Sequence, residues 1–393
     1  RSWFYESISP DQIIQPVVQK LSGMKDLKEI SDWDLGKITK FAPQGGAAPL
    51  IKRLGGLEEY FLHLDKPAIT RELIWSKAKE TAVKRLKLNR SGAPLTLEQV
   101  VTRGLGEDKY YTSSGYPLYI KRKNPEAIEH ALSVAGSEVY RKYPFTLGTR
   151  ATMGKTGSEA RNIFMAPMAV NLVGQRYVLP LMDYLRTVRL RDRNLLRLSD
   201  LVGIMYFFQP WEGWDYVQET ISDHWDEGLK FGADYTKMDQ HFNKYHAFEV
   251  FDVIKNFFRP TFWPGLHESI EYVFDAPVIT NLGFINQQHS MPSGSEWTNF
   301  LETMWNYIFN IYLELKYHLR MELALGIGDD QLFILSDWII GRFNSKRTQK
   351  SMQWITDTVI REFELAGLPG NSEKQEVSFV ETGFLQRFMT TQW

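Results

Sequence analysis

The chain has 393 residues, of which 43% are apolar and 24% charged, as is typical of folded proteins. This composition excludes disorder, collagen and coiled-coil rods. The absence of cysteine excludes disulfides, thiolate metal sites and thiol nucleophiles. The length favours two or three domains, and no apolar run reaches the roughly 18 residues that would span a membrane. Because the sequence begins with Arg1 rather than Met, we expect it to be part of a longer chain.

The net charge of −1 hides an uneven distribution along the chain. Residues 121–197 contain fourteen Lys/Arg and six Asp/Glu, whereas residues 201–345 contain eight and twenty. A basic stretch can follow a phosphate backbone, and an acidic stretch can hold hard cations. The alternative, which charge alone favours, is that both stretches are solvated helix faces.

The first half of the chain is expected to be mainly helical. Residues 1–100 are predicted as helices separated by turns, and residues 125–142 as one further helix. The mixed Gly, Thr, Lys and Arg content of residues 145–170 predicts a loop that leads into a strand at 162–165. Residues 171–198 are predicted as one long helix.

In the second half, helices and short strands alternate. We predict a helix over 213–228, a strand over 229–234, and helical residues 246–275 broken at Pro260 and Pro264. The later predictions are a hairpin at 278–285, a helix behind Ser293-Gly294-Ser295-Glu296 with its capping-box spacing, strands at 323–327 and 331–335, and a helix at 352–367.

Two groups of carboxylates stand at strand ends. Gly328-Asp329-Asp330 lies between two apolar runs, so it is predicted to be a tight turn between buried strands. Two carboxylates held there would be costly without a cation. Asp234 ends a predicted strand, and Asp239 begins the following helix. Taken alone, this pair is slightly better interpreted as a helix cap and a solvated Asp than as a metal site.

A third polar group precedes the helix that begins near Trp297. Ser293-Gly294 forms its leading loop, and Thr298 and Asn299 lie in its first turns. The simplest interpretation is helix capping. An amide such as that of Asn299 could also hydrogen-bond a ligand hydroxyl.

Taken in order, these groups resemble motifs A, B and C of viral RNA-dependent RNA polymerases. The amino-acid sequences around Ser293-Gly294 and Gly328-Asp329-Asp330 are most similar to those of the picobirnavirus and partitivirus polymerases. Further segments resemble the remaining motifs: Thr112, Ser113, Ser114, Gly115, Tyr116 and Pro117 (motif G), Arg150, Lys155 and Arg161 (motif F), Lys374 (motif D) and Phe384-Leu385-Gln386-Arg387 (motif E).

The resemblance implies template-directed transfer of nucleotides from NTPs to an RNA 3′-hydroxyl. Two Mg²⁺ ions, which Mn²⁺ can replace, would be held by Asp234, Asp329 and Asp330. Lys374 would protonate the leaving pyrophosphate, and Arg150, Lys155 and Arg161 would neutralise the triphosphate. Nucleotide recognition would involve Asp239, Ser293, Gly294, Thr298 and Asn299, with Asp239 and Asn299 reading the ribose 2′-hydroxyl. The motif G segment, residues 112–117, would line the template path.

The expected fold is therefore an α+β right-hand polymerase with a small antiparallel palm sheet flanked by helices. Fingers are predicted over 1–185 and 244–290, and palm over 186–243 (motif A) and 291–393 (motifs B to E). Only six residues follow motif E, so we expect the thumb to be largely absent. The resemblance also implies RNA, NTPs and a viral capsid protein as partners, no membrane, and location in the virion and host cytoplasm.

Other functions remain open. A reverse transcriptase shares the palm, but it carries a bulky aromatic where Asp239 stands. A metal nuclease or phosphatase could use paired carboxylates without needing Ser293-Gly294 or Asn299. A truncated, inactive RNA-binding fragment would account for the basic stretch but would leave the acidic residues unexplained.

Overall fold

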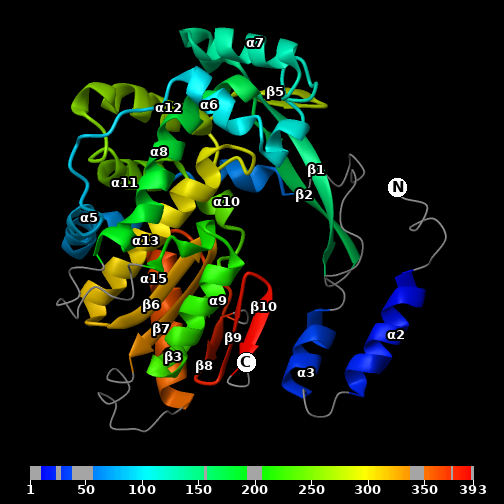
Figure 1. Ribbon diagram of the computed structural model, residues 1–393, viewed down its shortest axis with the longest axis vertical. Coiled ribbons are helices and arrows are strands. Elements are labelled where there is room, and N and C mark those ends of the chain that lie inside the picture. Colours follow the sequence, from blue (N-terminus) through cyan, green and yellow to red (C-terminus); the bar gives the residue numbers. More distant parts are fainter. Residues whose placement is uncertain are drawn as a thin grey trace. The chain divides into compact units, whose positions relative to one another are not determined.

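The computed structural model describes residues 10–23, 28–37, 56–154, 157–192, 206–336, 349–372 and 375–390 (Figure 1). The chain forms two compact units: residues 1–58 with 148–163, and residues 59–147 with 164–393. Each unit is built from two separate stretches of sequence.

In the first unit, the described residues form two helices and the outer part of a hairpin. The helices are α2 (Pro10–Ser22) and α3 (Lys28–Lys37), and the hairpin strands are β1 (Phe145–Gly154) and β2 (Gly157–Met165). The prediction of a loop over most of 145–161 was therefore wrong. At its start β1 alternates buried Phe145 and Leu147 with half-exposed Thr146, which is the period of a strand.

The first half of the second unit consists of short helices followed by the long helix α8. Thr96 begins α6 with a capping box formed with Gln99. The predicted 125–142 helix is interrupted at Gly136, and Ser137 starts a new 3₁₀ turn by accepting from the Val139 N–H. The elements are η3 (Glu58–Phe61), η4 (Ala68–Arg71), α5 (Leu73–Arg85), α6 (Leu97–Gly104), η5 (Asp108–Tyr111), α7 (Pro125–Ala135), η6 (Glu138–Lys142) and α8 (Met168–Asp192).

The later helices carry a second correction. The chain leaves helix α11 after Ile254, whereas Pro260 begins a 3₁₀ turn and Pro264 lies in the first turn of α12. Proline is tolerated there because the first helical N–H groups have no partner in the helix. The elements are η8 (Gln209–Trp211), α9 (Trp214–Asp223), η9 (Trp225–Glu227), α10 (Met238–His241), α11 (Lys244–Ile254), η10 (Pro260–Phe262), α12 (Trp263–Asp275), α13 (Trp297–Tyr317) and α15 (Gln349–Leu365).

The central sheet has four antiparallel strands in the order β6-β7-β3-β8. Its strands are β6 (Met321–Ile327), β7 (Asp330–Ser336), β3 (Gly228–Ala233) and β8 (Glu376–Ser378), and the hairpin β9 (Glu381–Phe384) and β10 (Arg387–Thr390) follows. The predicted hairpin at 278–285 is confirmed as β4 (Val278–Thr280) and β5 (Gly283–Ile285). β4 also pairs in parallel with the start of β1, at Phe145 and Thr146.

Both faces of the central sheet are covered. On one face Phe231 and Phe333 stack at 4.8 Å between ring centroids, in the core that includes residues of α13 and α15. On the other face Leu332 and Ile334 pack with Val217 and Ile221 of α9 and with the β9–β10 hairpin. Figure 1 shows the long helices and α9 around this sheet. Burial on both faces explains why the sequences of β6 and β7 are nearly continuous apolar runs.

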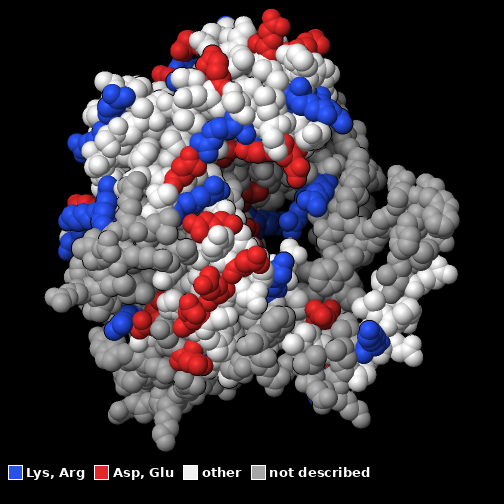
Figure 2. Space-filling view, in the orientation of Figure 1, with Lys and Arg blue, Asp and Glu red and all other residues white. Residues whose placement is uncertain are grey.

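The acidic residues of the second half are partly a solvated helix face. Asp215, Glu219 and Asp223 are exposed and recur at helical spacing along α9. Figure 2 shows a line of acidic side chains along this helix. For these residues the simpler interpretation of the charge pattern is correct.

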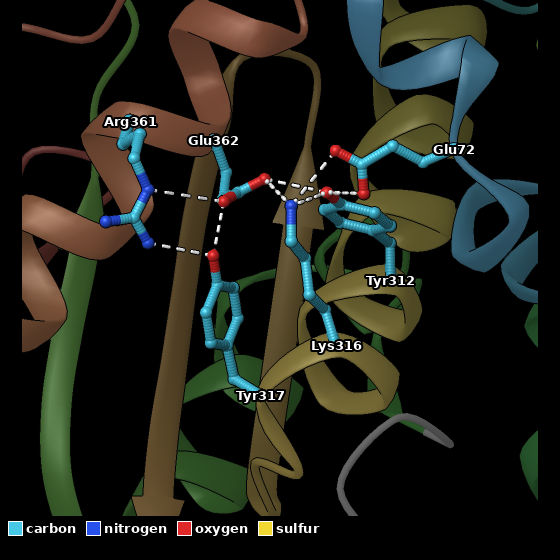
Figure 3. A network of polar contacts seen from close by, with 6 residues as sticks. All are labelled: Glu72, Tyr312, Lys316, Tyr317, Arg361 and Glu362. Carbon is cyan, nitrogen blue, oxygen red and sulfur yellow. Dashed lines mark hydrogen bonds and ion pairs between the residues drawn. The ribbon is translucent and has the colours of Figure 1, made fainter.

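A buried carboxylate joins three helices (Figure 3). Glu362 of α15 accepts from Tyr312 at 2.7 Å and from Lys316 at 2.9 Å, and Tyr317 also donates to it. Tyr312 and Lys316 also contact Glu72, which precedes α5. Hydrogen bonds from these three donors lower the pKa of Glu362 against the effect of burial. The network therefore fixes α5 and α15 against α13.

His246 makes folding of the second unit sensitive to acid. Its Nε2–H donates to the Ala366 carbonyl at 2.7 Å, and its Nδ1 accepts from the Asn243 N–H at 3.1 Å. Burial lowers its pKa to about 4 from the ordinary 6.5. The unfolded chain therefore binds more protons between these values, so stability present above pH 6.5 is lost as the pH falls toward 4.

We expect the free energy of unfolding to fall by about 2 kcal/mol more in wild type than in His246→Gln between pH 7 and pH 5. Denaturant titrations of both proteins at the two pH values would measure this difference. Parallel pH profiles would mean that the pKa of His246 is the same in the folded and the unfolded chain.

Candidate active site

The acidic motifs meet at one end of the central sheet. Ala233, the last residue of β3, pairs with Gln331, and Asp234 follows it directly. Asp330 begins β7 and pairs with Ile327 across the turn Gly328-Asp329. Asp234 and Asp330 therefore stand on adjacent strands, one step beyond the last residue pair between β3 and β7. Asp329 and Asp330 are exposed and Asp234 is half-buried.

The donor chemistry of this end suits a hard divalent cation. Asp234, Asp329 and Asp330 offer carboxylate oxygens, which Mg²⁺ and Mn²⁺ prefer. Among the residues that the structure describes, no three acidic, His or Cys side chains already converge closely enough to enclose an ion. Binding would therefore draw these side chains together from neighbouring backbone positions.

The turn that carries Asp329 needs a glycine at 328. Gly328 has a φ of +59°, in the left-handed region, and a Cβ there would lie 3.1 Å from Nδ2 of Asn299. The same position would lie 3.6 Å from Oε2 of Glu302. The start of α13 thus packs directly against the acidic turn.

The loop before α13 differs from the prediction. Helix α13 begins at Trp297 with Glu296 as its N-cap and no side-chain cap, so Ser293 and Glu296 form no capping box. Instead, Glu296 accepts from Gln175 of α8 at 2.8 Å, and Ser295 accepts from the Trp297 N–H at 3.1 Å. Tertiary contacts with α8 took the place of the local box.

Gly294 is required by a close backbone approach. A Cβ at this position would lie 1.8 Å from the carbonyl oxygen of Phe164 in β2. Only glycine fits at that distance. Thr298 holds the same loop by donating to the Pro292 carbonyl at 3.0 Å. Ser293 and Gly294 are therefore presented on a loop fixed from both sides.

The two residues predicted to read a sugar lie at the same place. Asn299 is exposed, and its Oδ1 accepts from Trp211 of η8 at 3.0 Å. Asp239 lies in the first turn of α10 and is hydrogen-bonded to Glu302. Because Glu302 and Asn299 both lie beside Gly328, Asp239 and Asn299 approach the acidic turn together.

Glu302 is a site residue that the sequence analysis missed. It is 4% exposed, and burial, followed by the nearby Asp239 carboxylate, raises its pKa well above the usual range. A hydrogen bond between two carboxyl groups requires that one of them carries a proton. In the sequence Glu302 is an acidic residue one helical turn beyond Thr298, flanked by Leu301 and Thr303.

The motif G segment is a compact turn near β2. Gly115 has a φ of +70°, and a Cβ there would lie 2.9 Å from the Ala166 carbonyl oxygen. The Met168 N–H donates to the Ser114 carbonyl at 2.8 Å, and Arg122 donates to the Ser113 carbonyl at 3.1 Å. Thr112 and Tyr116-Pro117 flank this turn. Residues 112–117 and Gly294 thus both pack against residues 164–168.

Two of the four predicted basic residues are described, and both belong to the first compact unit. Arg150 and Arg161 are exposed on β1 and β2 in the first compact unit. Lys155 and Lys374 lie outside the described residues. The motif E segment forms the β9–β10 turn, with Leu385 and Gln386 at positive φ, and Arg387 lies 4.4 Å from the Trp214 ring centroid.

Structural comparison gives clear similarities, although sequence comparison does not. No protein-family model matches the chain, and no curated protein matches it. The structure is similar to the RNA-dependent RNA polymerase of a human picobirnavirus, with a TM-score of 0.74 and 21% identity over 100% of this chain and 71% of that one. An insertion-loop deletion mutant of that polymerase gives 0.71 and 19%, over 98% and 72%. The chain therefore has an α+β fold like that of these viral polymerases.

Proposed function

We propose that the chain is an RNA-directed RNA polymerase that transfers nucleotides from NTPs to an RNA 3′-hydroxyl. The observation that carries the proposal is the meeting of Asp234 with Asp329-Asp330 on adjacent strand ends. Gly328 lies beside the start of α13, which follows the glycine-dependent Gly294 loop, in a fold similar to viral polymerases.

Asp234, Asp329 and Asp330 would hold two Mg²⁺ ions. Bound there, the ions would lower the pKa of the attacking hydroxyl and offset charge on the leaving pyrophosphate. The chain's own contribution is to hold three carboxylates at one sheet end and to align the primer hydroxyl with the α-phosphate. Such alignment alone can supply roughly 7–11 kcal/mol of a barrier.

Nucleotide selection would rest on the start of α13 and on α10. Asp239 can accept from a ribose 2′-hydroxyl, and the Asn299 amide NH₂ can donate to it, since Oδ1 of Asn299 is already engaged by Trp211. Ser293 would add a contact, with Gly294 and Thr298 shaping its loop. Lys374 is proposed as the proton donor to pyrophosphate, and Arg150, Lys155 and Arg161 as triphosphate contacts.

The wider organisation is proposed from the same resemblance. Residues 1–185 and 244–290 would form the fingers, 186–243 and 291–393 the palm, and residues 112–117 would line the template path. A viral capsid protein remains a proposed partner, and the virion and host cytoplasm the proposed location. None of the described helices has the length and apolar character needed to cross a membrane.

Primer extension tests this function directly. We expect wild type, with Mg²⁺ and the four NTPs, to extend an RNA primer on an RNA template and to use dNTPs much less well. Preference for dNTPs would instead indicate a reverse transcriptase, and RNA cleavage without extension a nuclease. RNA binding with neither reaction would indicate an inactive binding fragment.

A further inference from the structure

Helix α13 carries a stripe of polar residues although it is buried on most sides. Below the exposed Asn299, the side chains are almost fully enclosed: Glu302 is 4% exposed, and three others are 0% exposed. Positions three, four, seven and eleven residues beyond Asn299 share one helix face. The stripe consists of Asn299, Glu302, Thr303, Asn306 and Asn310. Buried polar groups of this kind need specific partners.

Two residues of the stripe hold the peptide groups of Gly328. The Gly328 N–H donates to Oγ1 of Thr303 at 2.7 Å, and the Gly328 carbonyl accepts from Nδ2 of Asn306 at 2.8 Å. Thr303 in turn donates to the Asn299 carbonyl at 2.6 Å. Both polar groups of the residue before Asp329 are thus fixed by one helix.

Asn306 also reaches the strand end that carries Asp234. Its Oδ1 accepts from the hydroxyl of Tyr235 at 2.6 Å, and the same hydroxyl accepts from Nε2 of Gln331 at 3.1 Å. Tyr235 is 2% exposed and packs on Phe363, with ring centroids 4.2 Å apart. A single amide therefore connects the residue before Asp329 with the residue after Asp234.

A second amide fixes the backbone of Asp234 itself. Oε1 of Gln375 accepts from the Asp234 N–H at 3.3 Å, and Nε2 of Gln375 donates to the Asp234 carbonyl at 2.7 Å. The residues that hold both acidic segments are neutral. They can therefore set the backbone positions without adding a formal charge next to the carboxylates.

We propose that Asn306 and Tyr235 are positioning residues that fix the separation between Asp234 and Asp329, and so the affinity of this pair for divalent cations. The inference rests on the proposed function, in which these carboxylates bind the ions. A shift of about 1 Å in a reacting group can cost roughly 10²-fold in rate. A buried bridge between the two segments is a direct means of preventing it.

The test uses two matched pairs of variants in the full chain. Tyr235→Phe removes a buried hydroxyl that contacts Asn306, and Tyr312→Phe removes a buried hydroxyl that contacts Glu72 and Glu362, in the network of Figure 3. Asn306→Leu removes the side-chain amide that contacts both Tyr235 and the Gly328 carbonyl. Asn310→Leu, one turn further, removes an amide whose atoms meet no protein partner among the described residues.

For each protein, Mn²⁺ binding is measured by electron paramagnetic resonance in the absence of RNA. The Tm is measured without metal, and kcat and KM are measured with NTP as the varied substrate. We expect Asn306→Leu to weaken Mn²⁺ binding about tenfold, and Tyr235→Phe about threefold. In both, kcat should fall at saturating Mg²⁺ while the KM for NTP stays within about twofold. Tyr312→Phe and Asn310→Leu should leave Mn²⁺ affinity within about twofold, whatever their Tm.

Unchanged Mn²⁺ affinity in Tyr235→Phe, together with a Tm loss like that of Tyr312→Phe, would reduce the bridge to a structural role. Tyr235→Phe deletes one oxygen, so it gives this comparison even if Asn306→Leu does not fold. Wild type that binds no Mn²⁺ would overturn the positioning proposal. Wild type that binds Mn²⁺ but extends no primer would overturn only the proposed function.

Discussion

Asp329→Asn is expected to abolish nucleotide addition while leaving the fold intact. The two side chains have nearly the same volume, and Asp329 is exposed at the turn, so folding does not depend on its charge. Loss of one negative ligand at a pair of divalent ions removes several kcal/mol of transition-state stabilisation, which corresponds to a rate loss of about 10³-fold or more. Single-nucleotide incorporation under saturating NTP and Mg²⁺ measures the loss.

Asp223→Asn is the matched control for this variant. Asp223 is an exposed carboxylate at the end of α9, and its replacement by Asn makes the same charge change. It should retain activity within about twofold. Equal extension by Asp329→Asn and wild type would refute the assignment of Asp329 as a metal ligand.

The second large effect concerns sugar choice. We expect wild type to prefer UTP over its 2′-deoxy analogue by on the order of 10²-fold, because the deoxy sugar lacks the hydroxyl that would donate to Asp239 and accept from Asn299. Asp239→Ala or Asn299→Ala should narrow this ratio with Mn²⁺ affinity kept. Incorporation of each nucleotide opposite a templating adenine gives the ratio directly.

A variant of Glu302 provides a further comparison for sugar choice. The hydrogen bond of Glu302 to Asp239 is a carboxyl contact that Glu302→Gln can replace with an amide donor. We therefore expect Glu302→Gln to disturb sugar choice less than Asp239→Ala does. An unchanged ratio in the Asp239 and Asn299 variants alike would refute sugar sensing by this pair and favour the reverse-transcriptase alternative.

Local sequence patterns were sufficient where local forces decide the structure. Apolar runs around Gly328-Asp329-Asp330 predicted the β6–β7 hairpin, and the run before Asp234 predicted β3. These features depend on residues a few positions apart, so the order of the acidic motifs could be read from the chain.

Long-range contacts decided the rest. The Ser293–Glu296 capping box is not formed because Asn171 and Gln175 of α8 bind the Glu296 backbone and side chain instead. The hairpin after Phe145 was missed because its composition resembles a loop. The roles of three residues depend on the packing of α13 against the Gly328 turn: Glu302, Thr303 and Asn306. Local sequence patterns do not specify this contact, because the two elements are distant in the chain.

Incorporation opposite four defined templates tests most directly whether this chain copies RNA. Four RNA duplexes that differ only in the templating base would be offered all four NTPs with Mg²⁺. We predict that wild type adds the complementary nucleotide in each case and that Asp329→Asn adds none. Addition of the same nucleotide on all four templates, or none by wild type, would contradict the account.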